Sequence, residues 1–533
     1  MDRPRDLTAW LTRPLLAGSV LVVLACGGEA SDAGGASSGR PGGSSPAAGP
    51  ADGVPTPGGA PAGAAGLGRA PDDPFAAVEN LILISLDTLR ADRLQTYGYE
   101  RPTSPQLEAF GQRAVVFENA RAQAPQTAPS HASLFTSEYP GAHRVINVHG
   151  PAPKVHRLPP GVTTLAEVAR AGGVETAAFV SGGNLTRKMD MDRGFDVWDE
   201  RLQGVRQRAD ALVAWMMKPG RGRFLAVLHT YEVHAPYLPP RELVPEFTDP
   251  AYQGPLRARL ERFLALPPDQ AWERATGGDY WEGMLDFDEA DVGFLSDLYD
   301  AEIRYLDGEF RRLVDYVEGH DELRRNTAIV VVADHGEEFK DHGKYQHDQV
   351  FDELLHVPLM IRLPPDLERA GYRGRVSEPV ELVDVAPTVA DLLGVDPGPA
   401  DWVGRSLVPL MRPGDGPPAG WETRPNFSEL VVDPGPKYHR TVTFQGWKYI
   451  HVWQKNIDHT WEWLFHVAED PEERVNLMDS EDPTARKALR RLQALLEERT
   501  LDNVRRADGM GEGDAVEMDA DMERLMRQLG YIK

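Results

Sequence analysis

Four stretches of continuous apolar residues, each as long as a single β-strand, limit the folds that this chain can adopt. They lie at residues 80–86, 175–181, 224–229 and 327–333. Runs without a polar-apolar alternation are typical of strands that are covered on both faces of a sheet. Helical patterns at 164–171 and 295–317 lie between them. This order predicts an α/β fold, a three-layer α/β/α sandwich with a mostly parallel central sheet.

Residues 412–533 follow a different pattern. Short segments at 426–432, 439–444, 447–453 and 461–466 are separated by turn residues, and helical patterns follow at 483–498 and 522–529. Such short segments predict an antiparallel sheet. We therefore expect a smaller C-terminal α+β subdomain at 412–533 beside a catalytic domain at 75–411. An aromatic and acidic stretch at 241–291 is predicted to be a cap or insertion in the larger domain.

The first 26 residues have the pattern of a bacterial lipoprotein signal peptide. Arg3, Arg5 and Arg13 precede an apolar run at 15–25 that is too short to span a bilayer comfortably. The run ends Val-Leu-Ala-Cys-Gly, which resembles a lipobox with Cys26 as the lipidated residue. A plain signal peptide with an incidental cysteine is the alternative. Cys26 is the only cysteine, which excludes intramolecular disulfides and cysteine metal ligands in the mature domain.

Residues 27–74 are rich in Gly, Ala, Ser and Pro and contain few large apolar residues, which predicts a disordered, flexible tether. A tether behind a lipid on Cys26 predicts an exported lipoprotein at the periplasmic face of the cell envelope. Gly27 carries no obvious inner-membrane retention signal, so we expect the outer membrane. The formal net charge of −25 argues against nucleic-acid binding, because phosphate backbones are held by clustered Lys and Arg. The negative charge does not exclude a small anionic substrate, since a bound metal reverses the local electrostatic field.

Residues with metal-binding side chains stand at the ends of three of the four apolar runs. Asp87 follows the first run, His229 ends the third, and Asp334 and His335 follow the fourth. Ligands of parallel sheets bind at the carboxyl edge of the strands. Charged side chains are rarely buried there without a partner. Asp87, Asp334 and His335 are therefore predicted to bind a divalent ion, with Zn²⁺, Mn²⁺ and Ca²⁺ all open.

The segment 126–140 has the residue order of a loop that opens into a helix. Thr127 precedes Pro129, and a proline in the first helical turn sacrifices no hydrogen bond. The start of such a helix offers free N–H groups and partial positive charge to an anion. Alone, Thr-x-Pro-Ser also describes an ordinary N-cap. Beside the predicted metal-binding residues, Thr127 becomes a candidate catalytic residue.

Taken together, these motifs resemble the sulfatase family, within the alkaline-phosphatase-like superfamily of metal hydrolases. The resemblance runs from about residue 80 to residue 533. It is carried by the segments 84–94, 97–105, 126–140, 229–237, 333–343, 357–359 and 447–450. The resemblance implies a metal-dependent hydrolase of sulfate or phosphate esters, with a small-molecule or glycan ester as the substrate and a divalent ion as the cofactor.

Carried over residue by residue, the resemblance implies a role for each matching position. The implied metal ligands are Asp87, Thr127, Asp334 and His335. Thr127 would also be the nucleophile, its pKa lowered by the ion, and would form a covalent intermediate. His234 would be the general acid for the leaving alkoxide, and His131 is a further catalytic candidate. The implied substrate-binding residues are Asn147, His347 and His229. In an alternative, His229 and Glu232 complete a second metal site with His234 or His347.

Three positions depart from the family pattern. The family has Cys or Ser where this chain has Thr127, and that residue is oxidised to formylglycine. It has Arg where the chain has His131, and a second Asp where the chain has Thr88. Threonine cannot become that aldehyde, so no formylglycine is expected. A formylglycine hydrate sheds sulfate by elimination, whereas water must attack the sulfur or phosphorus of a threonine ester directly.

Direct attack by water is a familiar route for phosphoryl groups. The Thr-x-Pro-x-His pattern also resembles nucleotide pyrophosphatase/phosphodiesterases. We therefore predict an enzyme that favours phosphorus over sulfur. A phosphodiesterase or a phosphoethanolamine transferase of the same superfamily is a second possibility, and a catalytically inactive binding lipoprotein is a third. Metal analysis distinguishes the inactive binding lipoprotein from the two enzymes. A protein that contains no metal and whose stability does not change with chelators would favour the binding lipoprotein.

Overall fold

The computed structural model describes residues 78–518 apart from short gaps at 149–153, 202, 268–269, 272–273, 276–279, 281–282, 413, 415–416, 422 and 433–436. The described residues belong to one compact unit. The predicted signal peptide at 1–26, the tether at 27–74 and the helix at 522–529 lie outside them. Within the described part of the chain, every helix is too short or too polar to cross a membrane.

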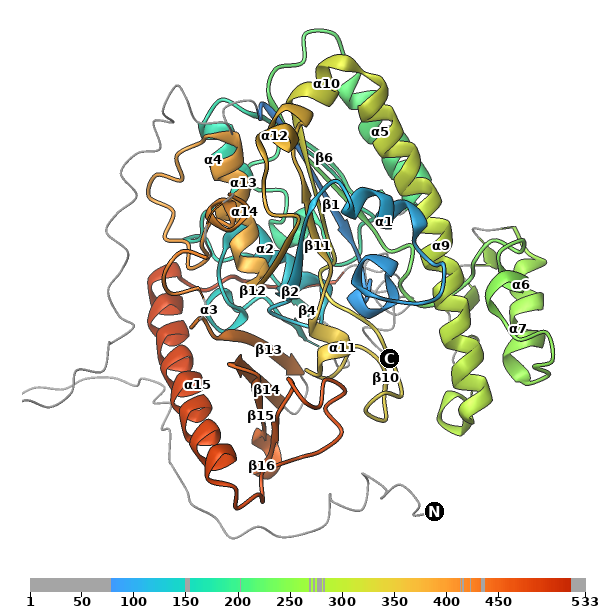
Figure 1. Ribbon diagram of the computed structural model, residues 1–533, viewed down its shortest axis with the longest axis vertical. Helices are drawn as coiled ribbons and strands as arrows, with labels where there is room; N and C mark the ends of the chain where they lie inside the picture. The colour runs from blue at the N-terminus through green and yellow to red at the C-terminus, as the bar shows by residue number, and fades with distance from the viewer. Residues whose placement is uncertain are drawn as a thin grey trace, which may run out of the picture. The chain divides into compact units, whose positions relative to one another are not determined.

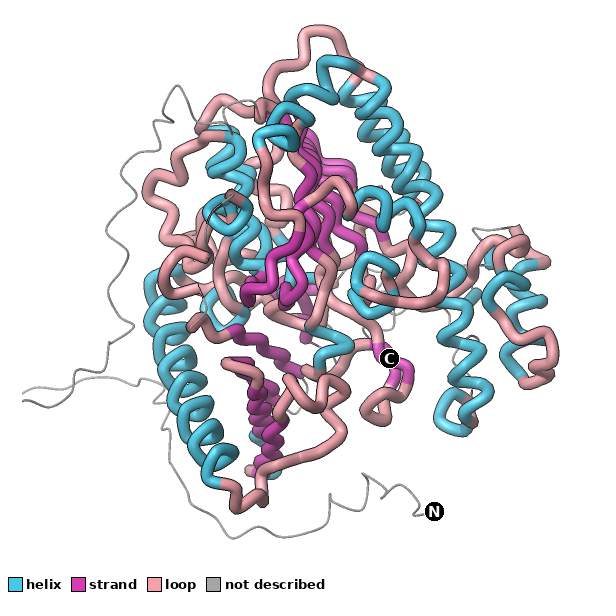
Figure 2. The backbone as a smooth tube through the Cα atoms, viewed as in Figure 1, coloured by secondary structure: helices cyan, strands magenta, loops and turns pink. Residues whose placement is uncertain are grey.

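An eight-stranded sheet forms the centre of the molecule, with strand order β12-β2-β11-β8-β1-β7-β5-β6 (Figure 2). Its strands are β1 Asn80–Leu86, β2 Val115–Arg121, β5 Glu175–Phe179, β6 Val197–Asp199, β7 Phe224–Thr230, β8 Thr327–Val332, β11 Leu359–Arg362 and β12 Arg375–Glu381. Only β11 runs antiparallel to its neighbours; the other pairs are parallel. The predicted mostly parallel sheet is confirmed, and the four apolar runs form β1, β5, β7 and β8.

Helices cover both faces of this sheet, which explains why its central strands lack a polar face. Every residue of β1, β7 and β8 is buried. Helices α2 (Thr127–Thr136), α4 (Leu165–Ala171) and α13 (Val385–Leu393) pack together on one face. Helices α1 (Pro105–Gly111), α5 (Val205–Met216) and α9 (Glu289–Gly319) pack on the other (Figure 1). The three-layer α/β/α sandwich is thus confirmed.

Capping residues set the starts of the two helices that the sequence predicts in this domain. Thr164 and Glu167 form a reciprocal capping box at α4. Asp288 and Asp291 do the same for α9, which begins before the predicted residue 295. Each box satisfies two backbone N–H groups that a helix start leaves unpaired. A local side-chain contact, rather than the apolar pattern, therefore sets where α9 begins.

Shorter elements complete the larger domain. They are α3 Pro140–His143, β3 Asn147–Val148, β4 Lys154–His156, α6 Val244–Phe247, α7 Pro255–Leu264, α10 Asp321–Asn326, β9 Glu338–Phe339, β10 Tyr345–Gln346, α11 Asp352–Leu355, α12 Pro365–Ala370 and α14 Val408–Met411, with 3₁₀ turns at Ala91–Arg93, Gln95–Tyr97, Arg187–Met189, Met284–Asp286 and Leu382–Asp384. In the predicted cap, α6 and α7 pack on α9. The cap also reaches the sheet edge, because the Tyr280 hydroxyl donates to the Tyr237 carbonyl at 3.1 Å.

A second, antiparallel sheet forms the C-terminal part, as predicted. Its strands are β13 Asn426–Val432, β14 Lys437–Phe444, β15 Trp447–Gln454 and β16 His459–Phe465, in that order. Helix α15 (Pro483–Met510) packs on β14 and β15 and runs further than the predicted residue 498. A short 3₁₀ turn at Lys455–Ile457 joins β15 to β16, and β17 (Ala515–Glu517) pairs with β4 of the larger domain.

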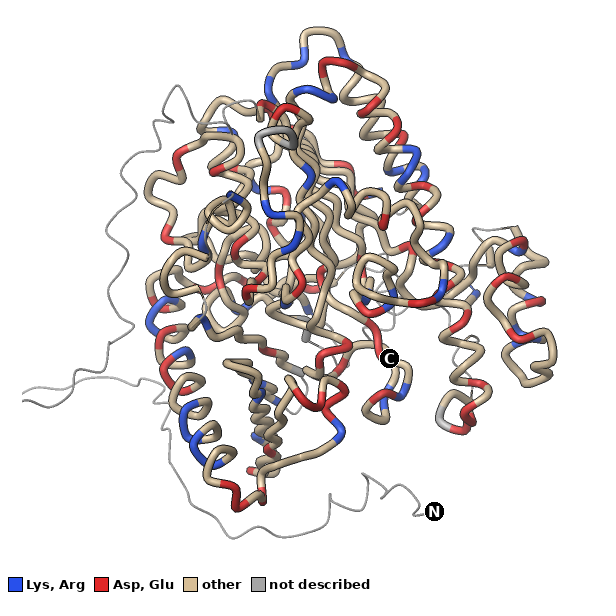
Figure 3. Tube along the Cα trace, viewed as in Figure 1, with Lys and Arg blue, Asp and Glu red and all other residues tan. Residues whose placement is uncertain are grey.

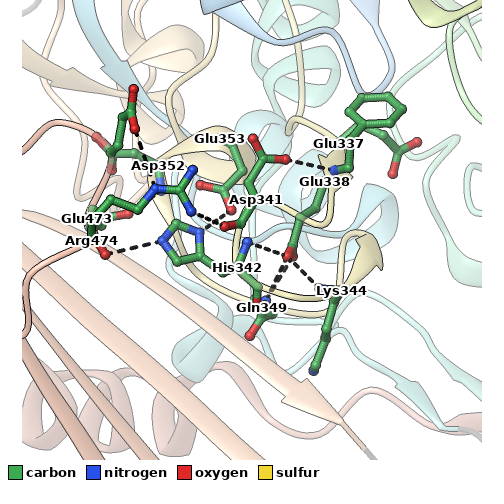
Figure 4. Close-up of polar contacts among 12 residues, drawn as sticks. Glu337, Glu338, Asp341, His342, Lys344, Gln349, Asp352, Glu353, Glu473 and Arg474 are labelled. Carbon is green, nitrogen blue, oxygen red and sulfur yellow. Dashed lines mark hydrogen bonds and ion pairs between the residues drawn. The ribbon is translucent and has the colours of Figure 1, made fainter. Parts of the chain in front are cut away.

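A buried ion cluster joins the C-terminal sheet to the loop that follows β8. Lys448 on β15 is fully buried and contacts Asp352 at 3.0 Å and Glu473 at 2.8 Å. Figure 4 shows Asp352 and Glu473 beside the loop of His342, whose Nδ1 lies 2.7 Å from Glu353. The Glu473 carboxylate also accepts from the Asp352 backbone N–H at 2.7 Å. The C-terminal part is therefore attached to the start of α11 by charged groups that are buried or largely buried.

Replacing Lys448 with methionine should destabilise the protein by about 3 kcal/mol, since the buried Glu473 would lose its cation. Asp352 would keep its ion pair with Arg121, at 2.6 Å. Urea unfolding followed by tryptophan fluorescence measures this loss. The exposed Lys455 provides a matched control, and Lys455→Met should change the stability by less than about 0.5 kcal/mol. A Lys448→Met protein as stable as this control would show that the ion cluster does not hold the two parts together.

Candidate active site

The carboxyl ends of the three central strands bring the predicted site residues together. Strand β1 lies between β7 and β8, with Ser85 in register with His229 on one side and with Val332 on the other. Asp87 directly follows β1, and Asp334 lies just beyond β8. Because parallel strands end at one edge, these side chains meet there, as the sequence predicts.

Thr127 is the first residue of α2, and its hydroxyl points at the two strand ends. Its Oγ1 donates to Asp87 Oδ2 at 3.0 Å and lies 3.5 Å from His335 Nε2. Pro129 occupies the first turn, as predicted. The hydroxyl is fully buried and stands at the positive end of the helix. The Thr127 hydroxyl, a candidate nucleophile, therefore lies next to two candidate metal ligands, Asp87 and His335.

The two carboxylates each keep one oxygen without a hydrogen-bond donor. Asp334 Oδ1 accepts from the backbone N–H groups of Thr88 and His335, at 3.3 and 2.9 Å. Asp334 Oδ2 and Asp87 Oδ1 are buried and lack a hydrogen bond among the described residues. Burial raises the pKa of both carboxyls, and the charge of Asp334 adds to the rise at Asp87. Two buried carboxylates with free oxygens are the arrangement that a cation stabilises.

The spacing of the surrounding atoms also fits a shared ion. Asp87, Asp334 and His335 form a group whose ligand atoms all lie within 4.8 Å of one another. His335 Nε2 is 3.6 Å from Asp334 Oδ2. Its other nitrogen, Nδ1, lies 2.9 Å from the Gly336 carbonyl, so Nδ1 carries the proton and Nε2 is the acceptor. Burial lowers the pKa of His335 to about 3, so the ring is neutral and able to bind a metal.

The turn after β1 has a strained backbone that a tyrosine supports. Thr88 has φ +55°, which is uncommon for a β-branched residue. The Tyr299 hydroxyl, on α9, donates to the Thr88 carbonyl at 2.7 Å and accepts from the Arg90 N–H at 2.9 Å. This conformation directs the Thr88 N–H to Asp334. Tyr299 gives no signal in the sequence, because it lies about two hundred residues away on a helix.

Two buried histidines lie behind the carboxylates. His229 Nε2 is 3.1 Å from Asp87 Oδ2. His131 Nδ1 is 2.9 Å from the Thr127 carbonyl and 3.4 Å from Asp334 Oδ2, and its Nε2 is 2.9 Å from Ser85 Oγ. Burial lowers the pKa of both rings. His229, a candidate for substrate binding, and His131, a candidate catalytic residue, therefore contact the predicted metal ligands and the backbone of Thr127.

His234 and His347 form a second pair of imidazoles at the site. Their Nε2 atoms are 3.3 Å apart, and the ring centroids of His347 and His335 are 4.7 Å apart. His234 Nδ1 lies 2.7 Å from the Ala235 carbonyl, which orients the ring. Burial and the neighbouring His347 lower the pKa of His234 to about 3, so the ring is neutral in the free protein. Both predicted residues thus reach the same region as Thr127.

The structure does not bring Glu232 to the site, and it does not describe the side chain of Asn147. Asn147 belongs to β3, which pairs with β4 in a separate three-stranded sheet, and its side chain lies outside what the structure describes. Glu232 accepts from the Val205 N–H at 2.8 Å, at the start of α5. It caps that helix, so the geometry does not place it with His229 on a second metal.

Sequence reasoning missed two serines of the site. Ser85 contacts His131, and Ser130 Oγ donates to the Asp334 carbonyl at 2.7 Å. The sequence could have indicated Ser85, because it is the one hydroxyl residue in an otherwise apolar strand interior. Ser130 had a weaker one, since a serine in a first helical turn is ordinary.

Comparison with known proteins finds two matching family profiles and related enzymes. The profile of the sulfatase family matches residues 79–395, and that of the N-sulphoglucosamine sulphohydrolase C-terminal region matches residues 340–502. A Delta 4,5-hexuronate-2-O-sulfatase of Bacteroides thetaiotaomicron is 25% identical over 451 residues, which cover 79% of this chain and 88% of that protein.

Solved structures share the fold at lower identity. One, in complex with its substrate D-glucosamine-2-N,6-O-disulfate, superposes with a TM-score of 0.63 at 20% identity, covering 80% of this chain and 98% of its own. The phosphonate monoester hydrolase of Agrobacterium radiobacter gives 0.59 at 19% identity, covering 83% and 99%. The family profile spans more than half of the chain, and the strand-end residues lie within it. The chain therefore belongs to the sulfatase family of hydrolases.

Proposed function

We propose that this protein is a metal-dependent ester hydrolase in which Thr127, rather than a formylglycine, is the nucleophile. The observation that supports this most directly is the position of Thr127 Oγ1, 3.0 Å from Asp87 Oδ2 and 3.5 Å from His335 Nε2. A sulfate or phosphate ester is the proposed substrate. The substrates named for the relatives, a sulfated hexuronate and a disulfated glucosamine, make a sulfated or phosphorylated glycan the first class to test.

The proposed ion is held by Asp87, Asp334, His335 and Thr127. Two carboxylates, one imidazole and one hydroxyl form a donor set that favours Zn²⁺ or Mn²⁺, whereas Ca²⁺ takes six to eight oxygen ligands. When bound, the ion supplies positive charge beside Thr127 and lowers the pKa of its hydroxyl. His131, through the Thr127 carbonyl, and His229, through Asp87, would hold these two metal ligands in place.

In the proposed reaction, Thr127 Oγ gives its proton to Asp87 Oδ2 and attacks the sulfur or phosphorus of the ester, and the bond to the leaving alkoxide breaks. The alkoxide takes a proton from the His234 imidazolium. Water then gives a proton to His234 and attacks the sulfur or phosphorus, the bond to Thr127 Oγ breaks to release the acid, and Thr127 recovers its proton from Asp87. His234 is neutral in the free protein, but an anionic ester beside it would raise its pKa because negative charge favours imidazolium. His347, in contact with His234, is proposed to hold an oxygen of the ester.

A substrate panel tests the nucleophile and the reacting element. Purified protein should hydrolyse matched aryl phosphate monoesters and diesters faster than the aryl sulfate, because a threonine ester cannot eliminate sulfate. Thr127→Ala should lower kcat by about 10³-fold or more on each active substrate. Thr127→Ser, which keeps the hydroxyl, is the matched control and should retain most of the activity. A clear sulfate preference that Thr127→Ala abolishes would refute the preference for phosphorus while keeping the nucleophile.

The proposed acid is tested on the same panel. Activated aryl esters need little proton donation, so His234→Ala should cost about 10²-fold more kcat on alkyl than on aryl esters. An equal loss on both would argue against His234 as the acid.

Removal of the metal should affect stability as well as turnover. Dialysis against a chelator should abolish hydrolysis and lower the melting temperature, because an ion that binds only the folded state stabilises it. Zn²⁺ or Mn²⁺ should restore both, and Ca²⁺ should restore them less well. An Asp334→Asn variant should lack the metal-dependent rise in melting temperature. A protein that contains no metal and whose melting ignores the chelator would favour an inactive binding role.

We further propose that the chain is exported and anchored by a lipid on Cys26, on the periplasmic side of the outer membrane. The lipobox-like end of the N-terminal apolar run supports this. Cells grown with labelled palmitate should yield labelled protein in the membrane fraction. Cys26→Ser should remove the label and move the protein to the soluble fraction. If the wild-type protein carried no label, the lipid anchor would be refuted and a plain signal peptide would be the remaining explanation of the N-terminal segment.

A further inference from the structure

Four side-chain nitrogens without a carboxylate partner in the described part of the chain gather where the His347 loop faces the C-terminal sheet. They belong to Lys344 on the loop, Lys437 and His439 on β14, and Trp461 on β16. None of these residues takes part in the proposed chemistry at Thr127. Neither lysine forms an ion pair with a described carboxylate, although Asp348 acts on Lys437 and the chain has a formal net charge of −25.

The strand register places three of these side chains on one face of the C-terminal sheet. His439 pairs with Val452, and Val452 pairs with Trp461, so the three form one row across the sheet. Lys437 lies two residues before His439 and therefore points to the same face. The Lys437 Nζ stands 5.0 Å from the centroid of the Trp461 ring. Val452 in this row belongs to the main core, so this face of the sheet is turned toward the larger domain.

Lys344 approaches from the loop that carries His347. It lies three residues before His347, and its Nζ donates to the Asp348 backbone carbonyl at 3.3 Å. Figure 4 shows its side chain pointing away from the labelled carboxylates of the network. Burial and the charge of Lys344 lower the pKa of Lys437, while the nearby Asp348 opposes this. The positive charge of Lys344 therefore acts against that of Lys437.

The two ring nitrogens in this cluster are buried without a partner. His439 Nε2 and Trp461 Nε1 are inaccessible and make no hydrogen bond within the described residues. The whole His439 side chain is only 5% exposed. An unpaired buried polar group of this kind costs about 1–3 kcal/mol. Both this cost and the repulsion between the lysines would be relieved by one negatively charged group that offers oxygen acceptors.

We propose that Lys344, Lys437, His439 and Trp461 form an anion subsite that holds a second negative group of the substrate. The substrate class is then a glycan ester with at least one further sulfate, phosphate or carboxylate beside the scissile ester. This inference rests on the proposed function, because it assumes that the scissile ester lies at Thr127. Acidic residues are spread widely over the chain (Figure 3), so a polyanion needs such a local cationic group to bind.

Kinetics on sulfated disaccharides test the subsite. The series shares one scissile ester and differs in the number of other sulfate and carboxylate groups. For the parent protein, kcat/KM should rise with each further anionic group and the rise should shrink with added salt. Lys437→Met should reduce the preference for the more charged member by about tenfold, the usual size of a lost hydrogen bond to a charged group. Lys455→Met, in the same subdomain, should leave the preference unchanged.

Direct binding separates this inference from the proposed function. Calorimetry with the most charged disaccharide and the parent, Lys437→Met and Trp461→Phe proteins measures affinity without turnover. Weaker binding in both variants supports the subsite even if no ester is hydrolysed, in which case only the proposed function fails. Hydrolysis with an unchanged preference and unchanged affinity in Lys437→Met would overturn the subsite and leave the function standing. Circular dichroism of each variant confirms that it is folded.

Discussion

Two carboxylates held side by side without access to water are the constraint on which the rest of the site depends. Asp87 and Asp334 follow adjacent parallel strands, so the sheet register itself brings them together. Burial and the charge of Asp334 raise the pKa of Asp87, and each carboxylate keeps one oxygen without a donor. A cation resolves this arrangement better than protonation does, because it leaves both carboxylates charged and oriented.

The surrounding elements serve that pair of carboxylates. Helix α2 begins at Thr127, so the proposed nucleophile lies at the positive end of the helix. His131 and His229 contact Thr127, Asp334 and Asp87 from behind. Tyr299, on the long helix α9, holds the strained Thr88 that turns its N–H toward Asp334. Groups from both helical layers therefore support one small site.

The chain has the fold of its family, and the proposed function gives this fold a different chemistry. His131, at a position where the resemblance predicts Arg, is buried, and its Nδ1 lies 2.9 Å from the Thr127 carbonyl. In the proposed function, Thr127 takes the place of the formylglycine aldehyde. The proposed subsite at Lys437 and Trp461 adds a reason for the C-terminal sheet, which would then contribute to substrate choice as well as to stability.

The sequence by itself determined the layers and which polar residues follow the central strands. The apolar runs at β1, β5, β7 and β8 were recognisable because burial on both faces removes polar residues locally, and Asp87, Asp334 and His335 were recognisable because they follow those runs. The tertiary structure alone decided which distant groups meet them. Tyr299 at Thr88, Glu232 at the start of α5 and Lys344 near Lys437 depend on helix packing and on the register between separate sheets. Contacts of that kind join residues far apart in the chain, and no local pattern of residues records them.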